Sequence, residues 1–178
     1  LKLGTATAAL TVGMLLFQPD TAQAQEITFR SANLGLTNIG YGASPAFADL
    51  DGDGDLDLMT GDFYGNFHYF ENTGTAPEAA YTAPQTNPFG LTGVAYYSAP
   101  AFADLDADGD MDLMGGNSYG SFFYYENTGT ASAPAYAAPI TNPLGLTALY
   151  RSIPTFADLD TDGDLDMMVG EVGGRFFY

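Results

Sequence analysis

The sequence predicts an all-β fold, a partial β-propeller of about three four-stranded blades. The first observation is a repeat: residues 47–51 (FADLD) return as 102–106 and as 156–160, at spacings of 55 and 54 residues. The second is that each copy holds short apolar or aromatic runs separated by Gly, Pro, Asn and Asp, as turns require. The third is that Gly or Pro interrupts every candidate helix. Four strands in about 55 residues match one propeller blade.

The repeat units span residues 33–86, 87–141 and 142–178, the last of them incomplete. In the first unit we expect strands at 45–49, 56–60 and 67–71, and a weaker fourth strand around Tyr81. A β-solenoid or a repeated sandwich hairpin also uses short repeated strands, so both remain alternatives to the blade.

The first 24 residues have the layout of a secretory signal peptide. Lys2 is the positive start, residues 3–17 carry no charge, and Ala22 and Ala24 are the small residues of a cleavage site. The alternative is a buried N-terminal helix. With cleavage, the mature repeat domain spans residues 25–178, and no second apolar run follows. We therefore expect a secreted, extracellular or cell-surface protein with no membrane span in its mature chain.

The charge balance excludes several classes of partner. Asp and Glu number 22 against 4 Lys and Arg, so the formal net charge is −18. Nucleic acid and anionic lipid both need cationic partners, so neither is expected to bind. The chain has no cysteine, which excludes disulfides, thiolate metal sites and a cysteine nucleophile. An apolar content of 46% is too high for an acidic disordered tail.

Most of the acidic residues lie in three nine-residue loops with the pattern D-x-D-x-D-G-D-x-D. We call residues 49–57, 104–112 and 158–166 the first, second and third Asp loops, and number their positions 1 to 9. Five carboxylates in nine residues repel one another unless a cation neutralises them. The candidate metal-binding residues are Asp49, Asp51, Asp53, Asp55, Asp57, Asp104, Asp106, Asp108, Asp110, Asp112, Asp158, Asp160, Asp162, Asp164 and Asp166.

Calcium is the cation that fits this pattern, with about three ions in the chain, one for each repeat. Side chains 1, 3 and 5 face one side of a turning backbone, Gly at position 6 allows the turn, position 7 offers its carbonyl and position 9 closes the cage. An EF-hand needs a Glu at position 12, where this chain has Thr60, Gly115 and Val169. Mg²⁺ rarely uses an all-protein cage, and Zn²⁺ prefers His or Cys. The alternative is a solvated acidic loop that binds nothing.

These units resemble FG-GAP/VCBS repeats, the calcium-binding blades of integrin-α-like propellers in secreted proteins. The resemblance rests on the FADLDxDGDxD motif and on the downstream run 69–74 (YFENTG), and it covers residues 33–178. It implies that positions 1, 3, 5 and 9 of each Asp loop ligate Ca²⁺ by side chain and position 7 by its carbonyl. Closed propellers of this family have about seven blades, so this chain departs from the family in blade number.

The expected function is that of a non-catalytic, calcium-stabilised module for cell-surface or matrix adhesion and assembly, with an extracellular protein or glycan as its ligand. The open blade edges are expected to be completed by a longer parent chain or by neighbouring copies head-to-tail, as a homo-oligomer or filament. One alternative is the accessory part of a larger secreted enzyme. Another is a carbohydrate-binding propeller, in which exposed tyrosines stack on sugar rings: Tyr64, Tyr96, Tyr97, Tyr119 and Tyr150. His68 has no counterpart in the other units, which argues against catalysis.

Overall fold

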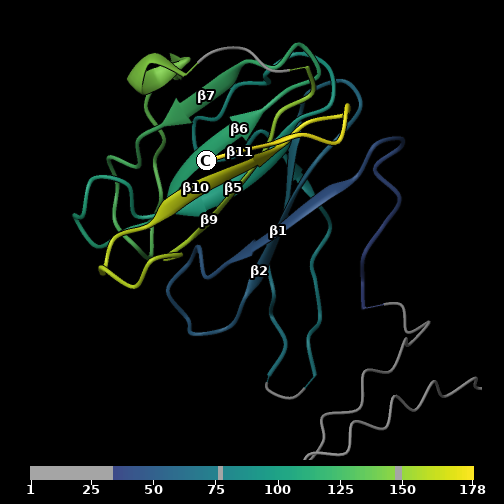
Figure 1. Cartoon of the computed structure of the whole chain (residues 1–178). Helices are drawn as coiled ribbons and strands as arrows, with labels where there is room; N and C mark the ends of the chain where they lie inside the picture. Colours follow the sequence, from purple (N-terminus) through teal and green to yellow (C-terminus); the bar gives the residue numbers. More distant parts are fainter. Residues whose placement is uncertain (1–33, 76–77, 147–149) are drawn as a thin grey trace, which may run out of the picture. The chain divides into compact units, whose positions relative to one another are not determined.

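The computed structural model describes residues 34–75, 78–146 and 150–178. There the chain forms three antiparallel sheets of consecutive strands (Figure 1), and we call these sheets blades 1, 2 and 3. Blade 1 contains β1 (Ser44–Ala48), β2 (Asp57–Gly61), β3 (Phe67–Phe70) and β4 (Gln85–Thr86). Blade 2 contains β5 (Ala99–Ala103), β6 (Asp112–Gly116), β7 (Phe122–Tyr125) and β8 (Ile140–Thr141), followed by a 3-10 turn, η1 (Pro143–Gly145). Blade 3 contains β9 (Ile153–Ala157), β10 (Asp166–Gly170) and β11 (Phe176–Phe177).

The predicted all-β partial propeller is confirmed, with two four-stranded blades and a three-stranded one. The register is the same in each blade, since Phe47 pairs with Leu58 and Phe102 pairs with Leu113. The fourth strand was predicted at the wrong place. It is β4, whereas Tyr81 makes only an isolated bridge with Asn72. Pro84 has no backbone N–H, so a continuous ladder forms only after it.

The core lies between the blades, which pack face to face. Inner strand β1 lies beside β5, and β5 lies beside β9. Successive residues of a strand point to opposite faces, so each blade contributes one apolar face to each neighbour. The contact between blades 1 and 2, which we call junction 1–2, includes Leu50, Met59, Phe67, Tyr69, Leu113, Tyr125 and Tyr136. The contact between blades 2 and 3, junction 2–3, includes Leu105, Met114, Phe122, Tyr124, Phe156 and Met167.

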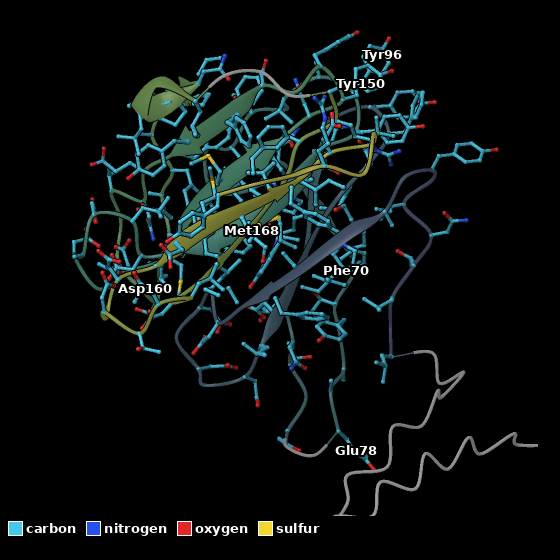
Figure 2. The ribbon with its side chains drawn as sticks, viewed as in Figure 1. Phe70, Glu78, Tyr96, Tyr150, Asp160 and Met168 are labelled. Carbon is cyan, nitrogen blue, oxygen red and sulfur yellow. The ribbon has the colours of Figure 1, made fainter. Side chains whose placement is uncertain are left out.

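Each blade has two chemically different ends. The Asp loop connects the first strand to the second, and a tight turn connects the second to the third, so antiparallel pairing places loop and turn at opposite ends. Figure 2 shows this separation in blade 3, where Asp160 and Tyr150 lie far apart. We call these the Asp end and the turn end.

The predicted signal peptide, residues 1–24, lies outside the described residues. Among the residues that are described, no helix is long and apolar enough to cross a membrane.

Candidate metal centres

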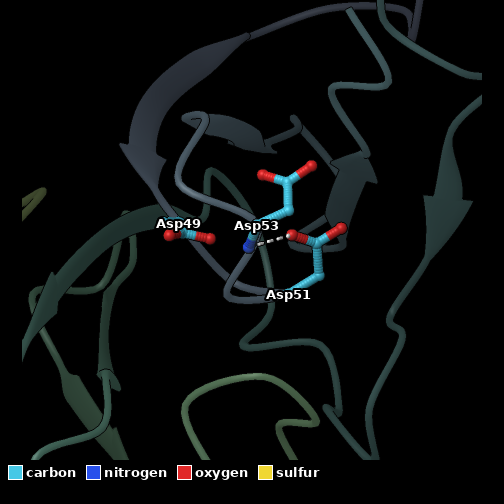
Figure 3. Close-up of side chains that lie close together, drawn as sticks. All are labelled: Asp49, Asp51 and Asp53. Atoms are coloured by element: carbon cyan, nitrogen blue, oxygen red, sulfur yellow. Dashed lines mark hydrogen bonds between the residues drawn. The ribbon is translucent and has the colours of Figure 1, made fainter.

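The fold gathers carboxylates in all three Asp loops. In the first loop, one oxygen each of Asp49, Asp51 and Asp53 lie within 4.8 Å of one another (Figure 3). The second loop gathers the carboxylates at the same positions, 1, 3 and 5, while the third gathers those at positions 1, 3 and 9. The residues so gathered are Asp104, Asp106 and Asp108 in the second loop, and Asp158, Asp160 and Asp166 in the third.

The carboxylate at position 1 shapes the loop. Asp49 Oδ1 accepts a hydrogen bond from Gly52 N at 2.8 Å, and Asp49 Oδ2 accepts one from Gly54 N at 3.0 Å. At position 3, Asp51 Oδ1 accepts one from Asp53 N at 3.2 Å. Related bonds recur at Asp104 and Asp158. These bonds curl the backbone around the carboxylates, so the loop sequence itself holds the acidic groups close together.

The predicted turn glycine at position 6 is confirmed, and position 4 adds a second left-handed residue. Gly54, Gly109 and Gly163 have φ of 93°, 98° and 100°. At position 4, Ala107 and Thr161 have φ of 62° and 65°. Residues with a Cβ rarely adopt this conformation. Sequence reasoning missed the constraint because position 4 is glycine only in the first loop.

The carboxylate at position 9 is a buried anchor between strands. Asp57 Oδ2 accepts hydrogen bonds from Leu50 N at 3.1 Å and Tyr69 OH at 3.0 Å, and Asp57 Oδ1 accepts one from Asn72 N at 2.7 Å. Burial raises the pKa of Asp57, although these hydrogen bonds oppose the shift. In blade 2 the corresponding donors to Asp112 are Leu105 N, Tyr124 OH and Asn127 N.

Position 9 therefore has different surroundings in the three loops. In the first two it is held by three protein donors and is not among the three gathered carboxylates. In the third, Asp166 accepts from Leu159 N and Tyr178 OH and also joins the gathered group. The tyrosine donors were missed as part of the site, although each lies twelve residues after position 9, a spacing that could have identified them.

The residue at position 7 is bonded to position 5 through its backbone in all three loops. Asp55, Asp110 and Asp164 each donate their backbone N–H to the carboxylate at position 5. Asp110 is buried, and within the described chain its Oδ1 has no hydrogen-bond partner. Burial, together with the negative charge of Asp108 and Asp112, raises the pKa of Asp110. A buried carboxylate oxygen without a donor is costly, but Asp110 is not among the three carboxylates gathered in its loop.

The donor set fits calcium. The gathered carboxylates offer only oxygen atoms, which Ca²⁺ prefers, and they offer no imidazole or thiolate for Zn²⁺. The gathered residues at positions 1, 3 and 5 would hold the ion in the first two loops, and their role as ligands stays a prediction. The predicted role of the position 7 carbonyl stays a prediction.

The chain was also compared with known proteins. The model of the FG-GAP-like repeat matches it twice, over residues 49–115 and 104–169. Both matches start at position 1 of an Asp loop and extend into the next blade. No curated protein matches the chain. Because the two matches together cover more than half of the sequence, the chain belongs to the FG-GAP-like repeat family.

Proposed function

We propose that this protein is a secreted, non-catalytic repeat module whose blades are stabilised by calcium, one ion for each Asp loop. The observation that carries the proposal is the gathering of three carboxylates within the Asp loop of each of the three blades. FG-GAP-like repeats are typical of extracellular proteins, where calcium is abundant, and we propose adhesion or assembly as the role of the module.

Calcium acts here on folding. Each Asp loop joins the first two strands of a blade, so an ion held by the loop also holds those strands together. Binding free energy then becomes folding free energy. Three ions would also reduce the net charge from −18 to about −12, which lowers the repulsion within the folded chain.

Titration of the mature chain with Ca²⁺ in a calorimeter tests this proposal. We expect about three bound ions and a melting temperature that falls strongly in excess chelator, with Mg²⁺ restoring little of the loss. Asp53→Ala and Asp108→Ala should each remove one ion. Asp62→Asn, a change outside the loops, is the matched control and should keep all three. A melting curve that does not respond to chelator would contradict the structural role of calcium.

Export is tested separately, because calcium binding does not depend on it. Expression of the full chain in a secreting host, followed by N-terminal sequencing of the exported protein, should give Gln25 as the first residue. Retention of residues 1–24 in the mature protein would contradict the signal peptide.

The surroundings of His68 support a structural role for this residue. Its Nε2 lies 2.9 Å from Asp62 Oδ2, and its Nδ1 lies 3.2 Å from Thr86 Oγ1. Both ring nitrogens are thus engaged by protein groups that link β3 to β4 and to the adjacent turn. We therefore propose that His68 holds blade 1 together, and that the module is not an enzyme.

A second candidate function, glycan binding, is favoured by the tyrosines at the turn end. A tyrosine three residues before the first strand is exposed in each of the three blades. One further tyrosine is exposed in the turn of blade 1 and one in the turn of blade 2. Tyr97 differs, because it packs against Phe63 and under the guanidinium of Arg151. Aromatic faces stack on sugar rings, and a charge of −18 favours neutral glycans over acidic ones. The exposed set is Tyr41, Tyr64, Tyr96, Tyr119 and Tyr150.

A glycan array probed with the wild-type module tests this second candidate. The double variant Tyr96→Ala/Tyr119→Ala removes two tyrosines that pack edge to face, with ring centroids 6.0 Å apart. We expect it to lose any binding while keeping its calcium stoichiometry. Equal binding by wild type and variant would assign the glycan contact elsewhere.

A further inference from the structure

A buried serine fastens each junction between blades. At junction 1–2, Ser98 Oγ donates to Asn66 O at 2.6 Å and accepts from Asp62 N at 3.0 Å, and Ser98 N donates to Asp62 O at 3.1 Å. At junction 2–3, Ser152 makes the same three bonds to Ser121 O, Asn117 N and Asn117 O. We call this arrangement the serine latch. It inserts the residue before one blade's first strand into the preceding blade's turn.

A glycine in the preceding blade makes room for the latch. A Cβ on Gly61 would overlap the carbonyl oxygen of Ser98, and a Cβ on Gly116 would overlap that of Ser152. The counterpart in blade 3 is Gly170, at the same place before the turn. A Cβ there meets only Phe176 Cε1, at 3.9 Å. Within the described chain, blade 3 thus has the glycine and the turn of a latch but no segment inserted into it.

The face of blade 3 that corresponds to the blade 2-facing side of blade 1 is also uncovered within the described chain. In blade 1, Leu50, Phe67 and Tyr69 face blade 2 and are 2%, 0% and 2% exposed. Their counterparts in blade 3 are 51%, 75% and 76% exposed: Leu159, Phe176 and Tyr178. The positions that form a core elsewhere in the molecule therefore form an open apolar surface here, and such surfaces mark docking sites.

Blade 1 presents a complementary edge. Phe102 and Phe156, in the first strands of blades 2 and 3, pack into the core of the junction with the preceding blade. Their counterpart in blade 1, Phe47, is 55% exposed. Gly42 and Ala43 occupy the places of the residues that insert at the two internal junctions. The backbone N–H groups of Gly42 and Ala43 correspond to those that donate to the preceding blade at the internal junctions. In a complex of two copies they would donate to Val172 O and Glu171 O of the other copy.

We propose that the partner of the blade 3 face is a second copy of this chain, which docks there through blade 1. The proposal deepens the assembly role proposed above and rests on blades folded with calcium. The contact would repeat the arrangement of the two internal junctions, with side chains at equivalent positions of the repeat. Two copies of residues 34–178 would bring six blades together, and closed propellers contain about four to eight. We therefore expect this segment of the chain to form a dimer in which the contact is used twice.

The mass of the mature chain in solution, measured by light scattering in about 1 mM Ca²⁺ and about 150 mM salt, tests the proposal. This salt screens the repulsion between two strongly acidic copies. Gly170→Ala is the decisive variant, because its methyl group has space in a single chain but would collide with the carbonyl oxygen of Ala43 in a second copy. We expect about a tenfold or greater weakening of dimerisation, with an unchanged calcium stoichiometry.

Ala43→Ser sharpens the test in the opposite direction. It restores the hydroxyl that both internal latches use, so dimerisation should tighten by about fivefold. A monomeric wild type, or a dimer that neither variant affects, would overturn the proposal. Because calcium titration of the same samples is read independently, failure of the assembly and failure of the calcium role are distinguishable.

Discussion

Junctions 1–2 and 2–3 are fastened alike but filled differently. Ser98 and Ser152 make the same hydrogen bonds, at two places far apart in the sequence. In junction 1–2, Tyr125 and Tyr136 are buried in the core, and the hollow of about 400 Å³ beside it is partly polar, with Asp51, Glu71, Gln85 and Ser132 in its lining. Junction 2–3 instead leaves an apolar cleft of about 490 Å³, lined by Leu105, Met114, Tyr124, Ile140, Leu146, Phe156 and Met167. The hydrogen bonds between blades are thus the same at both junctions, whereas the apolar filling differs.

We expect the largest difference in stability between the junctions when the equivalent phenylalanine of each blade is replaced by alanine. Phe67 and Phe122 are both fully buried, whereas Phe176 is exposed. We expect Phe67→Ala to lower the free energy of unfolding by about 3–5 kcal/mol. Phe122→Ala should cost about 3 kcal/mol or less, because side chains beside the cleft can relax, and Phe176→Ala should cost little. Urea unfolding of dilute protein in excess Ca²⁺ measures the series. Equal losses at Phe67 and Phe122 would show that the cleft gives no freedom to relax.

We expect the two serine latches to contribute equally to the free energy of unfolding. Ser98→Ala and Ser152→Ala each remove a buried hydroxyl and leave Asn66 O or Ser121 O with one bond fewer. We expect each change to destabilise the fold by about 1–2 kcal/mol. Melting curves of the two variants at the same calcium concentration make the comparison. A loss at one junction only would mean that the filling, rather than the latch, sets the spacing.

A smaller and opposite effect is expected at position 4 of the Asp loops. Ala107 has φ of 62°, a conformation that glycine adopts freely. Ala107→Gly should therefore raise the free energy of unfolding by up to about 1 kcal/mol in saturating Ca²⁺. Its matched control is Ala101→Gly, in the extended strand β5, which should destabilise the fold.

The smallest expected effect on stability is a pH dependence in the acid range, which arises from Asp62 in the turn of blade 1. Burial acts to raise the pKa of Asp62, but hydrogen bonds from His68 and Asn66 outweigh it, so the pKa lies below its ordinary value. The stability gained from this ionised carboxylate is complete above the unfolded value of about 3.9 and is lost as the pH falls through the lower folded pKa. The difference in melting temperature between wild type and Asp62→Asn should therefore shrink below about pH 4. A difference that stays constant from pH 6 to pH 3 would contradict this assignment.

Local chemistry explains which features could be predicted. The first three strands of a blade and the Asp loops follow from runs of neighbouring residues, so their places and the glycine at position 6 were found correctly, whereas the fourth strand was misplaced around Tyr81. Position 4 was missed because Ala107 and Thr161 adopt a conformation that their side chains disfavour. The serine latch was missed because Ser98 bonds to a turn 32 to 36 residues earlier, and a serine in a short polar stretch gives no sign of such a partner. The Ca²⁺ ligands themselves stay a prediction.

The serine latch also has a consequence for how such proteins grow. It joins neighbouring blades mainly through backbone carbonyl oxygens and N–H groups, which every amino acid except proline supplies, and it uses one serine hydroxyl and one glycine. Duplication of a gene segment that encodes one repeat unit can thus add a blade to the protein. The main-chain hydrogen bonds to the neighbouring blades persist even when the side chains of the new unit diverge.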